Sequence, residues 1–174
     1  MRPVLALILL SALQIPRLRP PDVKFVGTPQ NVVEAMLALA RVTSEDIVYD
    51  LGSGDGRIPI TAAQRYGARG VGIEIDPFYL RDALDNLKKA GVGDRVRFVN
   101  QDLFTSDISD ATVVAMFLTP QVLARLLPKL TRELRPGTRV VSHQYHFGDD
   151  RPAEKVEDVS GLTVYLWTIG QSLK

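Results

Sequence analysis

Cysteine is absent from this sequence, and histidine occurs only twice, at His143 and His146. The lack of cysteine excludes disulfide bridges, thiolate metal ligands and a cysteine nucleophile. The two histidines have no third partner at ligand spacing, so the sequence predicts no metal site. We interpret them as structural residues, with a role as general base as the alternative.

A surplus of charge of either sign is also lacking. The formal net charge is +1, and acidic and basic residues are interspersed along the chain. A dedicated nucleic-acid binder shows a basic stripe, so the sequence predicts no nucleic-acid partner. With 45% hydrophobic and 24% charged residues in 174, the composition indicates a soluble globular domain of ordinary size.

Long hydrophobic runs are missing except near the N-terminus. There, Arg2 precedes an apolar stretch of about 11 residues, and a segment rich in proline and arginine follows. The stretch is too short for a confident membrane span but resembles a signal peptide. We expect residues 1–21 to form a targeting or tether segment and linker, and residues 22–174 to form the domain. A membrane tether, a cleaved signal and a mis-assigned start all remain open.

A glycine-rich segment, Asp50-Leu51-Gly52-Ser53-Gly54-Asp55-Gly56-Arg57, stands between an apolar run and a helix-like stretch. Such a turn lets a ligand approach the backbone and the first N–H groups of the helix. The spacing differs from the dinucleotide fingerprint, whose third small residue would fall at Arg57. The acidic side chain of Asp50 would repel a pyrophosphate and attract a cation.

Three successive predicted strands end in an acidic residue. Asp50, Glu74 and Asp102 each follow an apolar run, at the spacing of strand-helix-strand units. In an open α/β sheet, ligands bind outside the carboxyl ends of the strands. The three carboxylates should therefore line one pocket, where Glu74 is placed to accept both hydroxyls of a ribose.

Hydrophobic periodicity alternates between strand and helix along the chain, which predicts a doubly wound α/β sheet. Expected helices lie near residues 28–40, 57–66, 77–90 and 120–134. Expected strands lie near residues 46–51, 70–75, 95–100, 111–118, 138–143, 155–159 and 162–169.

The segments DLGSGDGR, GIEID and NQDLF resemble the successive cofactor motifs of class I S-adenosylmethionine-dependent methyltransferases. The resemblance covers roughly residues 25–170. It implies a Rossmann-like, seven-stranded, mostly parallel, doubly wound sheet with a C-terminal antiparallel hairpin. It also implies S-adenosyl-L-methionine as the cofactor.

Further segments resemble a narrower group, the small protein-lysine methyltransferases. This group comprises archaeal broad-specificity enzymes and the mitochondrial enzymes that modify the ATP synthase c subunit and the adenine nucleotide translocator. The resemblance implies a protein substrate, modified on lysine. Related enzymes often have Tyr-Val-Pro-Thr-Pro where this chain has Phe25-Val26-Gly27-Thr28-Pro29, which puts a catalytic role for position 25 in doubt. The segments that carry the resemblance are FVGTPQNVVE, IVYDLGSGDGRI, ATVVAMFLTP and LRPGTRVVSHQY.

The resemblance assigns each cofactor residue a part of the ligand. Asp50 engages the ammonium group directly or through water, Glu74 the ribose hydroxyls and Asp102 the adenine amino group, with a simple turn acid as the alternative for Asp102. Thr28 adds a contact or serves only as a helix cap. The glycines let the backbone approach the methionine portion, and they are Gly52, Gly54 and Gly56.

Acceptor recognition is expected at the end of the fourth strand. Enzymes that methylate planar nitrogens typically carry an Asn/Asp-Pro-Pro-aromatic motif there, and Phe117-Leu118-Thr119-Pro120 lacks it. A lysine must be neutral to attack, and an apolar channel lowers the pKa of its amine. Phe25, Phe117 and Tyr145 are the candidates for such a channel, with core packing as the alternative.

Two other functions stay open on the sequence alone. One is methylation of a small molecule, lipid or quinone, and the other is a non-catalytic cofactor-binding module. Because the expected methyl donor is made in the cytoplasm, we expect a cytoplasmic protein, with tethering or export through residues 1–21 as alternatives. The sequence does not predict an oligomeric state.

Overall fold

A computed structural model of the chain describes residues 18–174. Most of the predicted N-terminal segment, residues 1–17, lies outside the described residues. Within residues 18–174, no helix combines the length and the apolar character needed to cross a membrane.

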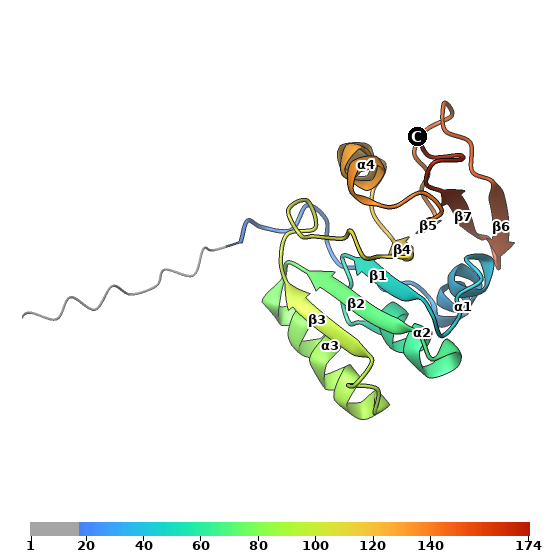
Figure 1. Cartoon of the computed structure of the whole chain (residues 1–174). Coiled ribbons are helices and arrows are strands. Elements are labelled where there is room, and N and C mark those ends of the chain that lie inside the picture. Colours follow the sequence, from blue (N-terminus) through green and yellow to red (C-terminus); the bar gives the residue numbers. More distant parts are fainter. Residues whose placement is uncertain (1–17) are drawn as a thin grey trace, which may run out of the picture.

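A single seven-stranded sheet forms the centre of the fold, in the order β3-β2-β1-β4-β5-β7-β6 (Figure 1). Strands β1 to β5 pair in parallel, and β7 runs antiparallel to both β5 and β6. This confirms the predicted mostly parallel sheet with a C-terminal hairpin. The elements are β1 (Ile47–Leu51), β2 (Arg69–Glu74), β3 (Val96–Asn100), β4 (Val113–Met116), β5 (Arg139–His143), β6 (Lys155–Val159), β7 (Leu162–Thr168), α1 (Gln30–Leu39), α2 (Arg57–Tyr66), α3 (Pro77–Ala90) and α4 (Pro120–Glu133).

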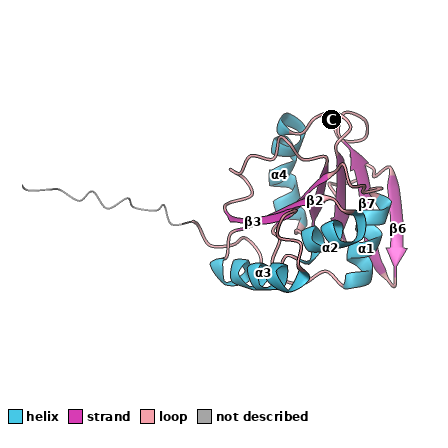
Figure 2. Cartoon of the chain, turned by 60° about the horizontal axis from the view of Figure 1, so that its bottom comes forward, coloured by secondary structure: helices cyan, strands magenta, loops and turns pink. Residues whose placement is uncertain are grey.

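Helices cover both faces of the sheet (Figure 2). The side chains of β4 show the division, because successive residues of a strand point to opposite faces. Val113 and Ala115 pack in the cluster with α1 and α2, whereas Val114 and Met116 pack in the cluster with α4. The sheet is therefore buried between two apolar layers, as a parallel sheet requires.

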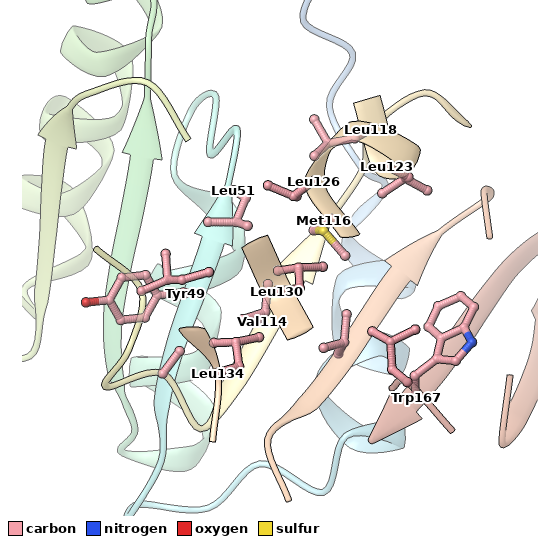
Figure 3. Packing of buried hydrophobic residues seen from close by; sticks show 14 of the residues in the cluster. Tyr49, Leu51, Val114, Met116, Leu118, Leu123, Leu126, Leu130, Leu134 and Trp167 are labelled. Carbon is pink, nitrogen blue, oxygen red and sulfur yellow. The ribbon is translucent and has the colours of Figure 1, made fainter. Parts of the chain in front are cut away.

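The cluster beneath α4 forms the larger part of the core. Leu126 and Leu130 of α4 lie over Leu51, Val114 and Met116 (Figure 3), and each of these side chains is fully buried. Burying one such side chain stabilises the fold by about 1.5–3 kcal/mol. This layer holds the carboxyl ends of β1 and β4 in fixed positions beside the site described below.

Helix starts place the backbone around that site. Helix α2 begins directly after Gly56, whose φ is +80°. Helix α3 begins with Pro77 after Asp76, whose side chain accepts the N–H of Phe78 and so caps the helix. Both helices therefore start within two or three residues of a strand end or a glycine turn.

The largest differences from the predicted boundaries are at β4 and α1. Strand β4 ends at Met116, because Phe117 and Leu118 leave the sheet and line a cavity. Helix α1 begins at Gln30, and Thr28 provides no side-chain cap. The Thr28 hydroxyl lies instead 3.3 Å from Nδ1 of His143. The interpretation of Thr28 as only a helix cap is therefore wrong.

Candidate active site

A cavity of about 470 Å³ opens at the carboxyl ends of β1, β2 and β4. Its size is that of a site for a small molecule. One wall comes from the strand ends and the glycine-rich turn, and another from the segment that precedes α1. Lining residues include Arg19, Phe25, Thr28, Asp50, Gly52, Ser53, Arg57, Glu74, Tyr79, Asp102, Phe117 and Leu118.

Glu74, at the end of β2, accepts hydrogen bonds from the glycine-rich turn and from the turn before α3. Its Oε2 accepts the N–H of Gly54 at 2.7 Å, and its Oε1 accepts the N–H of Asp76 at 2.9 Å. A carboxylate has about four acceptor positions. Each oxygen of Glu74 thus keeps capacity for one more donor, which fits the pair of hydroxyls on a ribose.

Asp50 is a buried carboxylate without a partner. Its side chain is 3% exposed, and no hydrogen-bond donor of the described residues reaches it. Burial, and then the charges of Glu74 and Asp55, raise the pKa of Asp50 well above its ordinary value. A buried carboxylate in this setting favours a cationic ligand.

Asp102 is held by a residue from the segment before α1. Arg19 donates Nε–H to Oδ2 at 2.5 Å and Nη2–H to Oδ1 at 2.9 Å, and the N–H of Phe104 donates to Oδ1. Burial raises the pKa of Asp102, but these bonds outweigh it, so the pKa lies below its ordinary value. Three of about four acceptor positions are therefore used, which leaves one for an adenine amino group.

Residues 18–21, which the sequence prediction assigned to the N-terminal segment, contact the domain. Arg19 and Pro21 both line the cavity, and Arg19 also pairs with Asp22. The contacts of the domain thus begin before the predicted boundary at residue 22.

The three glycines of the turn have different roles. Gly52 lines the cavity, and a Cβ there would have only Leu118 nearby, at 3.4 Å. A Cβ on Gly54 would lie 2.0 Å from the ring of Phe25, and one on Gly56 would lie 2.3 Å from the ring of Phe98. Only Gly52 therefore borders the cavity directly, while the other two make room for aromatic rings of the protein.

Gly56→Ala tests this packing role. We expect it to lower the free energy of unfolding by about 3 kcal/mol, because the new methyl group meets Phe98 and the residue keeps a positive φ. The matched control is Gly91→Ala, where φ is +69° but no atom lies within 4 Å. The control should lose only about 1 kcal/mol in urea denaturation. Equal losses in the two variants would contradict the packing role.

Arg57 links the glycine-rich turn to the segment before α1. Its Nη1–H donates to the carbonyl oxygen of Thr28 at 2.8 Å, and the guanidinium pairs with Asp55. The same guanidinium lies against Gly27, where a Cβ would be only 2.7 Å from Nη2. Arg57, which stands where the dinucleotide fingerprint has a small residue, therefore holds Thr28 at the cavity wall.

Aromatic rings also line the cavity. Phe25 and Phe117 are both lining residues, as the predicted channel requires. Tyr145 is not among the lining residues and instead stacks on Phe117, with ring centroids 6.2 Å apart. Tyr79, which the sequence analysis missed, lines the cavity and packs 4.5 Å from Phe25. Its position in the first turn of the helix that follows Glu74 could have predicted that Tyr79 lies near the cavity.

The two histidines differ in their surroundings. His143 is 2% exposed and packs 4.1 Å from the ring of Phe117, and burial lowers its pKa. His146 is exposed and lies beside Tyr165. In the part of the chain covered by the structure, no three acidic or histidine side chains are grouped to hold a metal ion.

These features fit the predicted cofactor. The cavity offers an unpaired carboxylate for an ammonium group, a second carboxylate for two hydroxyls, and a third with one open acceptor position. They belong to Asp50, Glu74 and Asp102, which the sheet brings to one edge as the sequence predicted.

Known proteins are similar to this chain in sequence. Residues 50–154 match the family described as ANTKMT methyltransferase domain. A protein-lysine N-methyltransferase from Saccharolobus islandicus is 50% identical over 155 residues, which cover 87% of this chain and 96% of the relative. The adenine nucleotide translocase lysine N-methyltransferase of Mus musculus is 39% identical over 71% of this chain. This chain spans about half of the mouse protein, 54%.

A solved structure agrees with the fold. A protein from Salinibacter ruber, titled an RNA methyltransferase in complex with S-adenosyl-L-homocysteine, is 53% identical and superposes with a TM-score of 0.81. The match covers 83% of this chain and 94% of that one. The predicted family, enzyme class and cofactor are thereby confirmed. This chain is an S-adenosylmethionine-dependent methyltransferase and belongs to the ANTKMT methyltransferase domain family.

Proposed function

We propose that this enzyme transfers methyl groups to the ε-amine of lysine side chains in proteins. The observation that carries the proposal is the 50% identity, over nearly the whole of both chains, to a protein-lysine N-methyltransferase. The mouse relative is also named as a lysine methyltransferase.

The cavity supports a lysine acceptor. Phe25, Tyr79 and Phe117 line it, and a long alkyl stem packs well between aromatic rings. Apolar surroundings disfavour the ammonium form and so lower the pKa of the arriving amine. Bound S-adenosylmethionine supplies an activated methyl group on its sulfonium sulfur. The protein's task is then to orient the neutral amine and to exclude water.

The absence of an inserted substrate domain also supports a protein acceptor. Between residues 18 and 174 the chain forms one sheet with its helices, and α3 and the segment before α1 border the cavity. Val26 and Phe78, next to the lining residues Phe25 and Tyr79, are 65% and 55% exposed. An exposed apolar rim of this kind favours contact with another macromolecule.

An RNA acceptor is the second candidate, because the relative from Salinibacter ruber is titled an RNA methyltransferase. Two features weigh against it. The segment Phe117-Leu118-Thr119-Pro120 lacks the motif expected for base methylation, and the net charge of +1 gives no basic stripe. We therefore rank lysine first and let one experiment separate the two acceptors.

The test is transfer of labelled methyl from S-adenosylmethionine into a cell extract by the full chain, with Glu74→Ala as the inactive control. We expect protease to release the label from the macromolecules of the extract and ribonuclease to leave it in place. Hydrolysis of the labelled material should yield methyl-lysine. Label released by ribonuclease would favour the RNA acceptor. Label soluble in organic solvent would favour a lipid or quinone, and either result would contradict the proposal.

The proposal also includes a cellular location. We propose that the enzyme works in the cytoplasm, where its cofactor is made. Fractionation of cells that produce the full chain tests this, and recovery of the protein in the membrane or outside the cell would contradict it.

A further inference from the structure

His143 is a buried histidine that the reaction described above leaves without a role. It ends β5, is 2% exposed and lies against the ring of Phe117. Burial lowers its pKa, which favours the neutral imidazole over the charged form. One ring nitrogen of a neutral imidazole donates a hydrogen bond and the other accepts one.

The contacts of its two nitrogens indicate which one carries the proton. Nδ1 lies 3.3 Å from Oγ1 of Thr28, whereas Nε2 is buried with no hydrogen-bond partner among the described residues. Among buried backbone groups an unpaired N–H is rarer than an unpaired acceptor, and we expect the same preference for the ring nitrogens of His143. The favoured tautomer therefore has the proton on Nδ1, which donates to Thr28.

This tautomer determines whether the Thr28 hydroxyl donates or accepts the hydrogen bond with His143. A hydroxyl that accepts from His143 keeps its own O–H as a donor. Thr28 lines the cavity, is 4% exposed and does not cap α1, so none of the described contacts uses that O–H. A donor at this wall suits an anionic group, and Arg57 holds the backbone of Thr28 in place through the Thr28 carbonyl oxygen.

S-adenosylmethionine has one anionic group, the carboxylate of its methionine portion. The acids Asp50, Glu74 and Asp102 cannot hold it, because like charges repel. We propose that His143 is a positioning residue for cofactor binding, which donates Nδ1–H to Thr28 and so turns the Thr28 hydroxyl toward the cofactor carboxylate. The proposal concerns the cofactor, and it does not depend on the identity of the acceptor.

The test compares two ligands by isothermal titration calorimetry. His143→Leu should weaken the binding of S-adenosylmethionine about tenfold, the loss of one hydrogen bond to a charged group. The decarboxylated analogue, which keeps the ammonium and the sulfonium, should bind His143→Leu and wild type equally. Equal weakening for both ligands, or none for either, would overturn the proposal.

Matched variants separate positioning from packing. His143→Asn places an N–H donor on the same Cγ and should restore most of the lost affinity. Thr28→Val should show the same selective loss, and the double variant with His143→Leu should lose no more than Thr28→Val alone. The exposed His146, changed to Asn, serves as the control without effect. Additive losses would contradict a shared hydrogen bond.

A spectroscopic readout tests the tautomer without any ligand. In a sample with ¹⁵N-labelled histidine, the shifts of the His143 ring should show Nδ1 protonated and Nε2 unprotonated. The opposite pattern would make Thr28 the donor to His143, and its hydroxyl would then not reach a carboxylate as a donor.

Discussion

Asp50→Asn should stabilise the cofactor-free enzyme and, at the same time, weaken S-adenosylmethionine binding about 100-fold. The carboxylate is buried without a hydrogen bond, and Glu74 and Asp55 repel it. An amide removes that unfavourable charge. It also removes the charged partner of the cofactor's ammonium, worth about 3 kcal/mol in a buried site. Urea denaturation and calorimetry measure the two effects.

Asp46 provides a matched control with the opposite sign. It is equally buried, just before β1, but accepts bonds from Thr43, Thr112 and Arg139. Burial raises the pKa of Asp46, yet these bonds lower it below the ordinary value. Asp46→Asn should therefore destabilise the fold and leave cofactor affinity unchanged. If Asp50→Asn also destabilises the protein, the unpaired state of Asp50 is contradicted.

The pH dependence follows from the directions of these shifts. The pKa of Asp50 is higher in the folded protein than in the unfolded protein. Its favourable contribution to the free energy of unfolding is therefore fully present below pH 3.8, and it is lost as the pH rises through the pKa of the folded protein. The stability gained by Asp50→Asn should accordingly vanish at low pH. Cofactor affinity of the wild type should fall as the pH drops through that pKa, because a protonated Asp50 cannot pair with the ammonium. Affinity of Asp50→Asn should not change over the same range.

Glu74→Gln should reduce cofactor affinity by at least 100-fold and lower the free energy of unfolding by about 2 kcal/mol. The glutamine amide has one acceptor oxygen where the carboxylate has two. Either the N–H of Gly54 or that of Asp76 then faces the amide nitrogen and stays unpaired, which destabilises both turns. The ribose hydroxyls also lose their charged acceptor.

Deoxyribose analogues of S-adenosylhomocysteine separate the ribose contact from the loss of turn structure. Wild type should prefer the natural ribose over the 2′-deoxy or the 3′-deoxy analogue by about tenfold. In Glu74→Gln at least one of these preferences should disappear. A preference that stays the same in both proteins would show that another residue holds the ribose.

The sheet and the acidic edge of the site were predictable because they follow from local patterns. Apolar runs end at Asp50 and Glu74, and the parallel register pairs Leu51 with Ile73 and so brings these two strand ends together. Glycine turns and an Asp-Pro start fixed the helix boundaries at Arg57 and Pro77. Each signal lies within a few residues of the feature it predicts.

Contacts between distant residues were not predictable. Arg19 and Asp102 are 83 positions apart, and a proline-rich segment has no periodicity that would assign a partner to Arg19. Thr28 and His143 are separated by 115 positions. Neither spacing carries a signal, so these pairs appear only in the folded protein.

The glycines show an intermediate case. Their positive φ angles and the close approach at the turn were predictable from the G-x-G-x-G spacing. The sequence did not indicate that the rings of Phe25 and Phe98 occupy the space beside Gly54 and Gly56. A glycine in the sequence indicates that another group lies close to the backbone, but it does not indicate which group.

A crystal structure of the full chain with S-adenosylhomocysteine tests the account most directly. We predict the ammonium group on Asp50, both ribose hydroxyls on Glu74 and the adenine amino group on Asp102, with Arg19 still bound to that carboxylate. A ligand bound in the reverse direction, with its adenine beside Asp50, or one that leaves Glu74 without a ribose contact, would contradict it.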